Sequence, residues 1–140
     1  MKDYSILENW IDDYNGAAIY SLVDENGKRY IGQAMHLQQR LETHRRALNR
    51  AYKGLPITII ENEKLLNAAS KGKKFKVEIL LKIPWYETTV NMLRYYENYY
   101  FQKYGGYNGT YNIAPIYAPV WNCKDFNIVK IKPLDGIRTV

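Results

Sequence analysis

The chain has 140 residues, 46% of them hydrophobic and 24% charged, and it carries a formal net charge of +6 with a pI near 9.3. A chain of this length is expected to form one domain with its own core, without room for a second folded module. We find no signal-peptide pattern or bilayer-length apolar run, and the single cysteine, Cys123, excludes an internal disulfide. We therefore expect a soluble, cytoplasmic (intracellular) protein, and its basic charge is weak evidence for a polyanionic partner.

The first predicted element is a short N-terminal helix over residues 3–14, which would pack on the domain. Its apolar side chains recur at helical spacing: Tyr4, Leu7, Trp10, Ile11 and Tyr14. Acidic residues lie between them, so this helix is a poor candidate for contact with phosphate. Asn15 and Gly16 end it.

A β-hairpin follows, with strands over Ala17–Val23 and Arg29–Gln33 and turn residues over Asp24–Gly27. A two-residue Asn-Gly loop would place Tyr20 and Tyr30 on opposite faces of the sheet.

A type I turn closed by a left-handed Gly27 would instead pair Leu22 with Tyr30. Tyr20 and Tyr30 would then share a face. We favour this second turn, because Asp in its first position and Gly in its fourth are the preferred composition.

The hydrophobic period then changes to three and four, which predicts an amphipathic helix from Met35 or His36 to about Tyr52. Arg40 and His44 are four residues apart on this helix and therefore lie on one face. The alternative is a basic, solvated helix in which neither has a special role.

Between the long helices, Ile57–Ile60 is either a strand or a buried loop, and Asn62–Lys71 is a helix that stops at Gly72. Alternating apolar residues from Phe75 to Ile83 predict the third strand of the sheet, with one apolar face.

A second long helix is predicted from Thr88 or Thr89 to Tyr104, and Glu97 lies inside its apolar and aromatic stripe. A carboxylate there is costly to desolvate, so it calls for a metal ion or an arginine. Alternatively, tyrosine hydroxyls make the stripe semi-polar and Glu97 pairs with a nearby lysine or arginine.

Residues 104–119 are expected to form a loop, and residues 120–132 to add an edge strand around Phe126–Ile131. The predicted fold class is α+β, sandwich-like, with a small three-stranded antiparallel sheet flanked by helices.

Five short motifs lie in order along this frame: Ala18-Ile19-Tyr20, Tyr30-Ile31-Gly32, the pair Arg40 and His44, Glu97, and Tyr111-Asn112-Ile113. Together they closely resemble the GIY-YIG nuclease superfamily, whose members cut DNA with a divalent metal. The resemblance covers residues 17–113. It departs from the family at Ala18, where the first glycine is expected, and at His36, where a polar helix-capping residue is usual.

The resemblance implies a single nuclease domain over residues 1–140, with a core at 17–113, the N-terminal helix at 3–14 and an extension at 114–140. It implies a metal-dependent endonuclease that hydrolyses DNA phosphodiester bonds with one Mg²⁺ or Mn²⁺ held by Glu97. The expected catalytic residues are Tyr20, Tyr30, Arg40, His44 and Glu97.

In this reading either Tyr20 or Tyr30 is the general base, and we favour Tyr20. Asn112 would orient Glu97 or a tyrosine from behind the site. The residues expected to contact the nucleic acid backbone are Lys28, Arg45, Lys73 and Lys74.

The expected partner is nucleic acid, DNA first, with a homodimer or a partner chain supplying specificity. Three alternatives remain at this stage. The first is a nuclease that acts on RNA or branched DNA. The second is a catalytically weak or inactive nucleic-acid-binding protein with the same fold. The third is a protein whose tyrosine-rich surface binds a protein partner.

Overall fold

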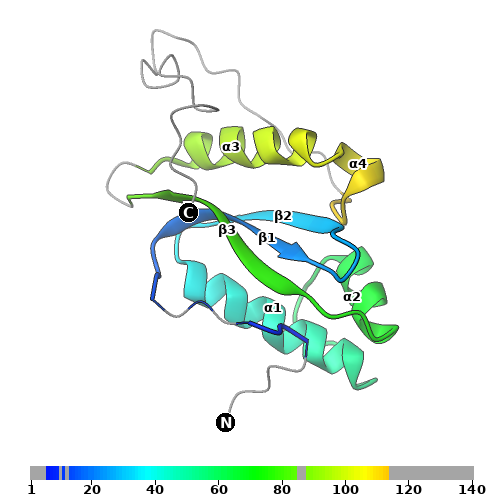
Figure 1. The fold of residues 1–140 in the computed structure, drawn as a ribbon. Helices are drawn as coiled ribbons and strands as arrows, with labels where there is room; N and C mark the ends of the chain where they lie inside the picture. The colour runs from blue at the N-terminus through cyan, green and yellow to red at the C-terminus, as the bar shows by residue number, and fades with distance from the viewer. Residues whose placement is uncertain (1–5, 10, 12, 85–87, 114–140) are drawn as a thin grey trace, which may run out of the picture.

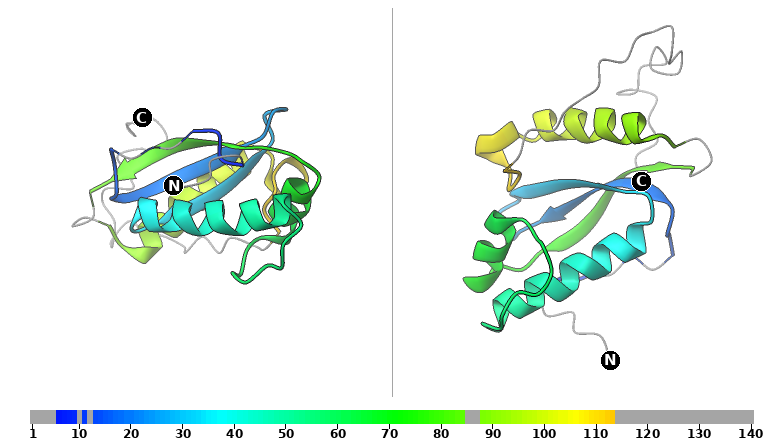
Figure 2. Two further views of the ribbon diagram at one scale, coloured as in Figure 1. Left: turned by 90° about the horizontal axis from the view of Figure 1, so that it is seen from below. Right: turned by 180° about the vertical axis from the view of Figure 1, so that it is seen from behind.

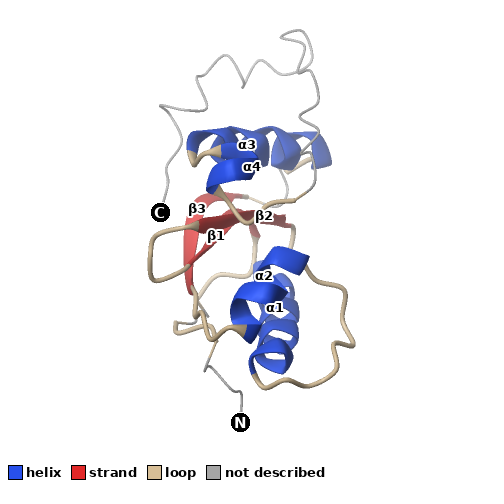
Figure 3. Cartoon of the chain, turned by 90° about the vertical axis from the view of Figure 1, so that its right-hand side faces the viewer, coloured by secondary structure: helices blue, strands red, loops and turns tan. Residues whose placement is uncertain are grey.

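The computed structural model describes residues 6–9, 11, 13–84 and 88–113, and it has three layers (Figures 1 and 2). The middle layer is an antiparallel sheet in the order β2-β1-β3, built from β1 (Ala17–Val23), β2 (Arg29–Ala34) and β3 (Lys76–Ile83). Helices α1 (Leu37–Tyr52) and α2 (Glu63–Ser70) cover one face, and α3 (Val90–Lys103) covers the other (Figure 3). This confirms the predicted three-stranded sheet flanked by helices. Cys123 and the expected C-terminal edge strand lie outside the described residues.

The hairpin turn has the predicted type. Gly27 adopts φ +84°, and its N–H donates to the Asp24 carbonyl at 3.0 Å. The Asp24 carboxylate accepts hydrogen bonds from the backbone N–H groups of Asn26 at 2.8 Å and Lys28 at 2.9 Å. An aspartate in the first position therefore holds the turn closed from inside, and the left-handed glycine completes it.

This turn fixes the register of the hairpin as expected. Leu22 lies opposite Tyr30, and Tyr20 lies opposite Gly32. Because side chains alternate along each strand, Tyr20 and Tyr30 point to the same face, the one covered by α1.

Strand β3 does not have the single apolar face that its alternation predicts. Tyr20 pairs with Ile79 and Ile19 pairs with Leu81, so Leu80 is one extra residue in β3. Such a bulge reverses the direction in which the following side chains point. The apolar residues before the bulge pack toward α1 and α2, whereas those after it pack toward α3.

The described part of the N-terminal segment is extended, so the predicted helix over residues 3–14 is wrong there. Leu7 forms a parallel bridge with Phe75, and backbone hydrogen bonds of 2.8 Å run in both directions between the segment and Phe75. The Asn9 side chain both donates to and accepts from the backbone of Val77. The free edge of β3 supplies backbone partners here, and Ile6 and Leu7 are fully buried against it.

The boundaries of α2 and α3 lie close to the predicted ones. Asn62 caps α2 and Thr89 caps α3, each accepting a hydrogen bond from a backbone N–H in the first turn. Left-handed glycines follow the two helices, Gly72 with φ +91° and Gly105 with φ +108°. None of the described helices is both long and apolar enough to cross a bilayer.

Two loop predictions need correction. The Ile57–Ile60 segment is neither a strand nor a buried loop, since it is largely exposed and Ile60 is 95% exposed. Backbone and side-chain hydrogen bonds of Arg50 hold the start of this loop to the end of α1. The expected loop after Tyr104 contains one helical turn, α4 (Gly106–Gly109).

Candidate active site

The site begins with the close packing of Tyr20 over Gly32. Tyr20 is fully buried, and a Cβ at Gly32 would lie 2.5 Å from the end of the Tyr20 ring. No real side chain makes so short a contact, so the position opposite Tyr20 has to be glycine. The glycine that ends the Tyr-Ile-Gly step thus creates the space in which the first tyrosine lies.

Helix α1 brings His44 under the sheet, against both tyrosines. The His44 ring centroid lies 5.6 Å from that of Tyr20 and 5.4 Å from that of Tyr30, both edge-on. The two tyrosine rings are 6.4 Å apart. The hairpin and the first long helix therefore deliver three of the predicted site residues to one place.

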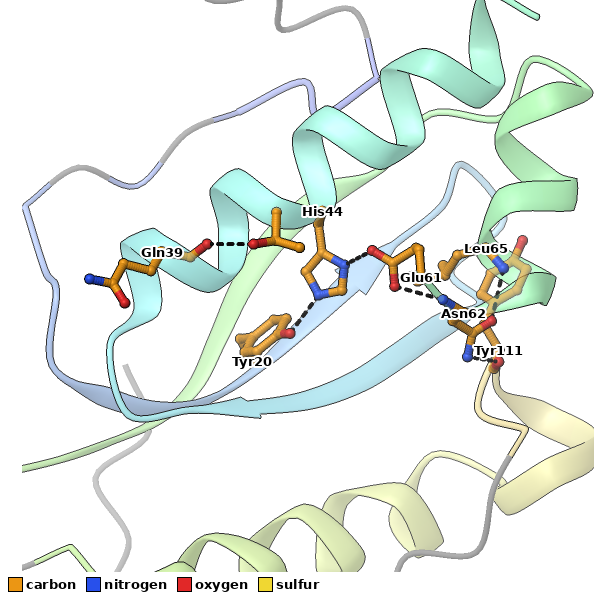
Figure 4. Close-up of polar contacts among 8 residues, drawn as sticks. Tyr20, Gln39, His44, Glu61, Asn62, Leu65 and Tyr111 are labelled. Atoms are coloured by element: carbon orange, nitrogen blue, oxygen red, sulfur yellow. Dashed lines mark hydrogen bonds and ion pairs between the residues drawn. The ribbon is translucent and has the colours of Figure 1, made fainter. Parts of the chain in front are cut away.

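His44 connects Tyr20 to a carboxylate that the sequence analysis did not single out. The Tyr20 hydroxyl lies 2.6 Å from Nε2 of His44, and Nδ1 of His44 is hydrogen-bonded to Oε2 of Glu61 (Figure 4). The side chain of His44 is fully buried and that of Glu61 is 1% exposed. The three groups form a closed, buried chain, which we call the Tyr20–His44–Glu61 chain.

The electrostatics of this chain assign its protonation. Burial raises the pKa of Tyr20 well above its usual value, with a smaller opposing effect of Arg40. Burial lowers the pKa of His44, although Glu61 opposes this. Burial alone would raise the pKa of the Glu61 carboxyl, but its bonds to His44 and to the N–H of Asn62 hold it below the usual value. At neutral pH the chain is therefore a tyrosine hydroxyl, a neutral imidazole and a carboxylate.

Arg40 lies beside the two tyrosine hydroxyls on the same helical face as His44. Burial disfavours its charge, but Tyr20, Tyr30 and Glu61 outweigh that effect and raise its pKa. Burial raises the pKa of Tyr30, and Arg40 is the strongest influence in the other direction. The guanidinium is thus permanently charged and partly exposed next to the two phenols.

Glu97 approaches from α3, on the other side of the sheet, beside the edge strand β2. Gln33 of that strand donates a hydrogen bond to Glu97 at 3.4 Å. Burial raises the pKa of the Glu97 carboxyl to about 7, against smaller opposing effects of Gln33, Arg40 and Arg94. Its half-buried carboxyl lies close enough to Arg40 and Tyr30 to influence both groups' electrostatics.

Asn112 does not contact Glu97 or a tyrosine through its hydrogen bonds, contrary to expectation. Its Oδ1 accepts from the backbone N–H of Ile31 at 3.0 Å, and its Nδ2 donates to the Ile31 carbonyl at 2.9 Å. Asn112 therefore clamps the outer edge of β2 between Tyr30 and Gly32. It positions the strand that carries the site.

Of the four residues expected to contact nucleic acid, three lie near the hairpin end of the sheet and Arg45 lies on α1. Lys28 packs over the Tyr111 ring at 4.6 Å, and Lys73 lies 3.9 Å from the buried Asp24. Both line a surface pocket at the hairpin end of the sheet. Lys74 follows Lys73 in the chain, and Arg45 pairs with Glu42 on α1.

Glu61 is the residue in this hydrogen-bond chain that sequence reasoning missed. It lies one residue before the Asn62 cap and directly after an apolar stretch, so no spacing motif connects it to His44. The one available signal was His44 itself, because a histidine within an apolar helix stripe needs polar partners when it is buried.

Comparisons with known proteins place this geometry in a family. Residues 16–112, well over half of the chain, match the family model for the GIY-YIG catalytic domain. The chain therefore belongs to the GIY-YIG family, as its motifs predict.

A solved structure with the same fold is the catalytic domain of the homing endonuclease I-TevI. It is 25% identical in sequence and superposes with a TM-score of 0.56 over 71% of this chain and 99% of that one. This confirms the predicted GIY-YIG type of fold. No curated protein matches the chain significantly.

Proposed function

We propose that this protein is an endonuclease that hydrolyses DNA phosphodiester bonds with one divalent ion, and that residues 1–140 form a single nuclease domain. The observation that carries the proposal is that the predicted catalytic side chains converge at strand β2. Tyr20, Tyr30, Arg40 and His44 meet on one side of this strand, and the Glu97 carboxyl comes from the other. Family membership and the likeness to a homing endonuclease domain support the same reaction class.

The donor chemistry at Glu97 fits a Mg²⁺ or Mn²⁺ ion whose shell is otherwise water and phosphate oxygen. Among the described residues, no cluster of three or more His, Cys, Asp or Glu side chains forms a complete metal cage. Mg²⁺ is commonly held by one or two carboxylates together with substrate phosphates. Such an ion supplies charge relief at the phosphate and leaving oxygen. A half-buried carboxyl with a pKa near 7 gains by exchanging its proton for a cation.

Arg40 would bind the scissile phosphate. Its guanidinium keeps a partly exposed side toward solvent while its charge is fixed by the tyrosines behind it. A planar fork of N–H donors suits two phosphate oxygens, and its charge opposes the negative charge that develops in the transition state.

The tyrosines and His44 would manage the proton of the attacking water. Tyr20 and Tyr30 both lie beside Arg40, which favours their ionised form, so both are candidates for the general base. Lys28, Arg45, Lys73 and Lys74 would contact the backbone without reading sequence. Specificity would come from a second copy or from a partner chain.

A nicking assay tests this function. Supercoiled plasmid, single-stranded DNA, a branched DNA and RNA are incubated with the protein in Mg²⁺, in Mn²⁺ and in EDTA. We expect metal-dependent nicking of plasmid, and an identically purified Glu97→Gln protein controls for contaminating nuclease. Faster cleavage of RNA or branched DNA would replace duplex DNA as the proposed substrate. Binding without cleavage of any substrate would favour an inactive nucleic-acid-binding protein.

A further inference from the structure

The Tyr20–His44–Glu61 chain has a direction that the two ring nitrogens of His44 define. Tyr20 is protonated, so its hydroxyl donates to Nε2 of His44 at 2.6 Å. Nε2 must then be the bare nitrogen and Nδ1 the protonated one, which donates to the Glu61 carboxylate. We propose that Glu61 is a positioning residue for the nuclease reaction, holding His44 in the tautomer that accepts the proton of Tyr20.

This inference rests on the proposed function and specifies how its base is prepared. The hydroxyl proton of Tyr20 moves to Nε2 of His44, and the phenolate oxygen takes a proton from the attacking water. The water O–H bond breaks, a new Tyr20 O–H bond forms, and the hydroxide attacks phosphorus. The bond from phosphorus to the leaving oxygen breaks, and that oxygen takes a proton from solvent. His44 ends as an imidazolium beside the carboxylate of Glu61, which stabilises the positive charge as it forms.

The chain also distinguishes the two candidate tyrosines. Tyr20 is joined to Nε2 of His44 by a hydrogen bond, whereas Tyr30 meets the same imidazole ring edge-on at a centroid distance of 5.4 Å. A proton can pass along the first contact, and the second is a packing contact. Of the two tyrosines, Tyr20 is therefore the one placed to pass its proton to His44, and Tyr30 lines the site next to Arg40.

A purely structural role does not account for Glu61. Helix α2 is already capped by the Asn62 side chain, which accepts from the N–H of Leu65 at 3.0 Å. A carboxylate that is 1% exposed carries a large desolvation cost, whereas a neutral polar side chain could accept the hydrogen bond from His44 without burying a charge. The retained charge is explained if His44 has to become positive during turnover.

Four charged or titratable groups face His44, and each comes from a different part of the chain. Tyr20 lies on β1, Tyr30 on β2 and Arg40 on α1, while Glu61 precedes α2. Arg40 disfavours the imidazolium and Glu61 favours it. Removing the charge of Glu61 leaves Arg40 unopposed, so the protonated form of His44 becomes harder to reach.

The test compares Glu61→Gln with Glu63→Gln, which neutralises an exposed glutamate two residues further along the chain. Single-turnover cleavage of plasmid is measured across pH, and affinity is measured with Ca²⁺ in place of Mg²⁺. We expect Glu61→Gln to lower the rate by about 10²- to 10⁴-fold, the range of a general acid–base contribution, with affinity within about twofold. Glu63→Gln should behave as wild type.

Two further readouts separate positioning from folding. Nitrogen-15 NMR of wild type should show His44 protonated at Nδ1, and Glu61→Gln should have little additional effect on the rate in a His44→Ala background. The proposal is overturned if wild-type His44 is protonated at Nε2, if the two substitutions reduce the rate independently, or if Glu61→Gln lowers only the melting temperature. If the wild-type protein does not cleave any substrate, the nuclease proposal itself is wrong. That result is distinguishable from the three outcomes above, which concern only Glu61.

Discussion

The two sides of the candidate site differ in how completely their polar groups are paired. On the inner side, Tyr20 and His44 are fully buried, the Glu61 side chain is 1% exposed, and each hydrogen-bonds the next. On the outer side, the Glu97 carboxyl is half-buried, and Gln33 donates to it at a long 3.4 Å. The inner side is a finished hydrogen-bond chain, and the outer side retains capacity for further ligands.

This difference indicates which chemistry belongs to each side. Buried, mutually satisfied groups keep their geometry without solvent reorganisation, which suits proton transfer between fixed atoms. A half-buried carboxyl with a raised pKa suits an ion that arrives with water and substrate. We therefore propose separate tasks for the two glutamates, Glu97 toward the ion and Glu61 toward His44.

The largest effect should come from the outer side. We expect Glu97→Gln to lower single-turnover cleavage by about 10³-fold or more, because it removes the carboxylate that we propose holds the ion. DNA affinity and melting temperature at neutral pH should stay near those of wild type. Cleavage retained within about tenfold, roughly 1.4 kcal/mol of barrier, would contradict the role of Glu97 as metal ligand.

Arg40 lies between the two sides, and its loss should be the next most severe. Arg40→Ala is expected to slow cleavage at saturating DNA by on the order of 10²-fold, with a modest loss of affinity. The measurement is a quenched time course at saturating DNA. If the variant cleaves at the wild-type rate there, Arg40 belongs to the basic surface and does not stabilise the transition state.

Substitution of basic residues away from the site should change DNA affinity without changing the rate of cleavage. The double variant Lys73→Ala with Lys74→Ala should weaken binding to every DNA sequence. Because fewer counterions are released, the slope of log binding constant against log salt concentration should become shallower by up to about two units. The contribution of Lys73 should be the smaller one, since it already lies 3.9 Å from Asp24. Lys82→Ala on the far strand β3 is the control. A slower single-turnover rate in the double variant would place these lysines in the catalytic site.

The smallest effect concerns stability without metal. The folded pKa of Glu97 is about 7, above its ordinary value of 4.5, so folding favours the protonated form. The stabilisation is complete below pH 4.5 and is lost as pH rises through 7. With the partial exposure of Glu97 taken into account, the free energy of unfolding of wild type should fall by about 1–2 kcal/mol between pH 5 and pH 8, relative to that of Glu97→Gln. Melting curves in EDTA measure this, and parallel curves for the two proteins would contradict the raised pKa.

Local sequence chemistry was sufficient for the hairpin and for the residues it carries. Asp24 and Gly27 specify the turn, the turn sets the register, and the register puts Tyr20 and Tyr30 on one face. The spacing of Arg40 and His44 on a single helix places both residues beside that face. These inferences succeed because each depends on contacts within a few residues or across one turn.

Features that depend on tertiary partners were not predictable. The N-terminal residues have helical spacing, yet the open edge of β3 draws Leu7 into a bridge with Phe75. The bulge at Leu80 divides the apolar residues of β3 between two faces. Glu61 lies 17 residues from His44 in sequence, in a loop whose path only the packed helices determine. Asn112 was expected to orient Glu97 or a tyrosine, but its side chain hydrogen-bonds the backbone of Ile31.

The division of labour between the two glutamates can be tested directly by counting bound Mn²⁺. Electron paramagnetic resonance titrations are made on wild type, Glu97→Gln and Glu61→Gln, each bound to a duplex with a non-cleavable linkage. Both variants remove one carboxylate charge with little change in volume, so each controls for the other. We predict that Glu97→Gln loses the bound Mn²⁺ and that Glu61→Gln retains it with wild-type affinity. Loss of the ion in Glu61→Gln, or its retention in Glu97→Gln, would contradict the assignment of the metal to the outer side of the site.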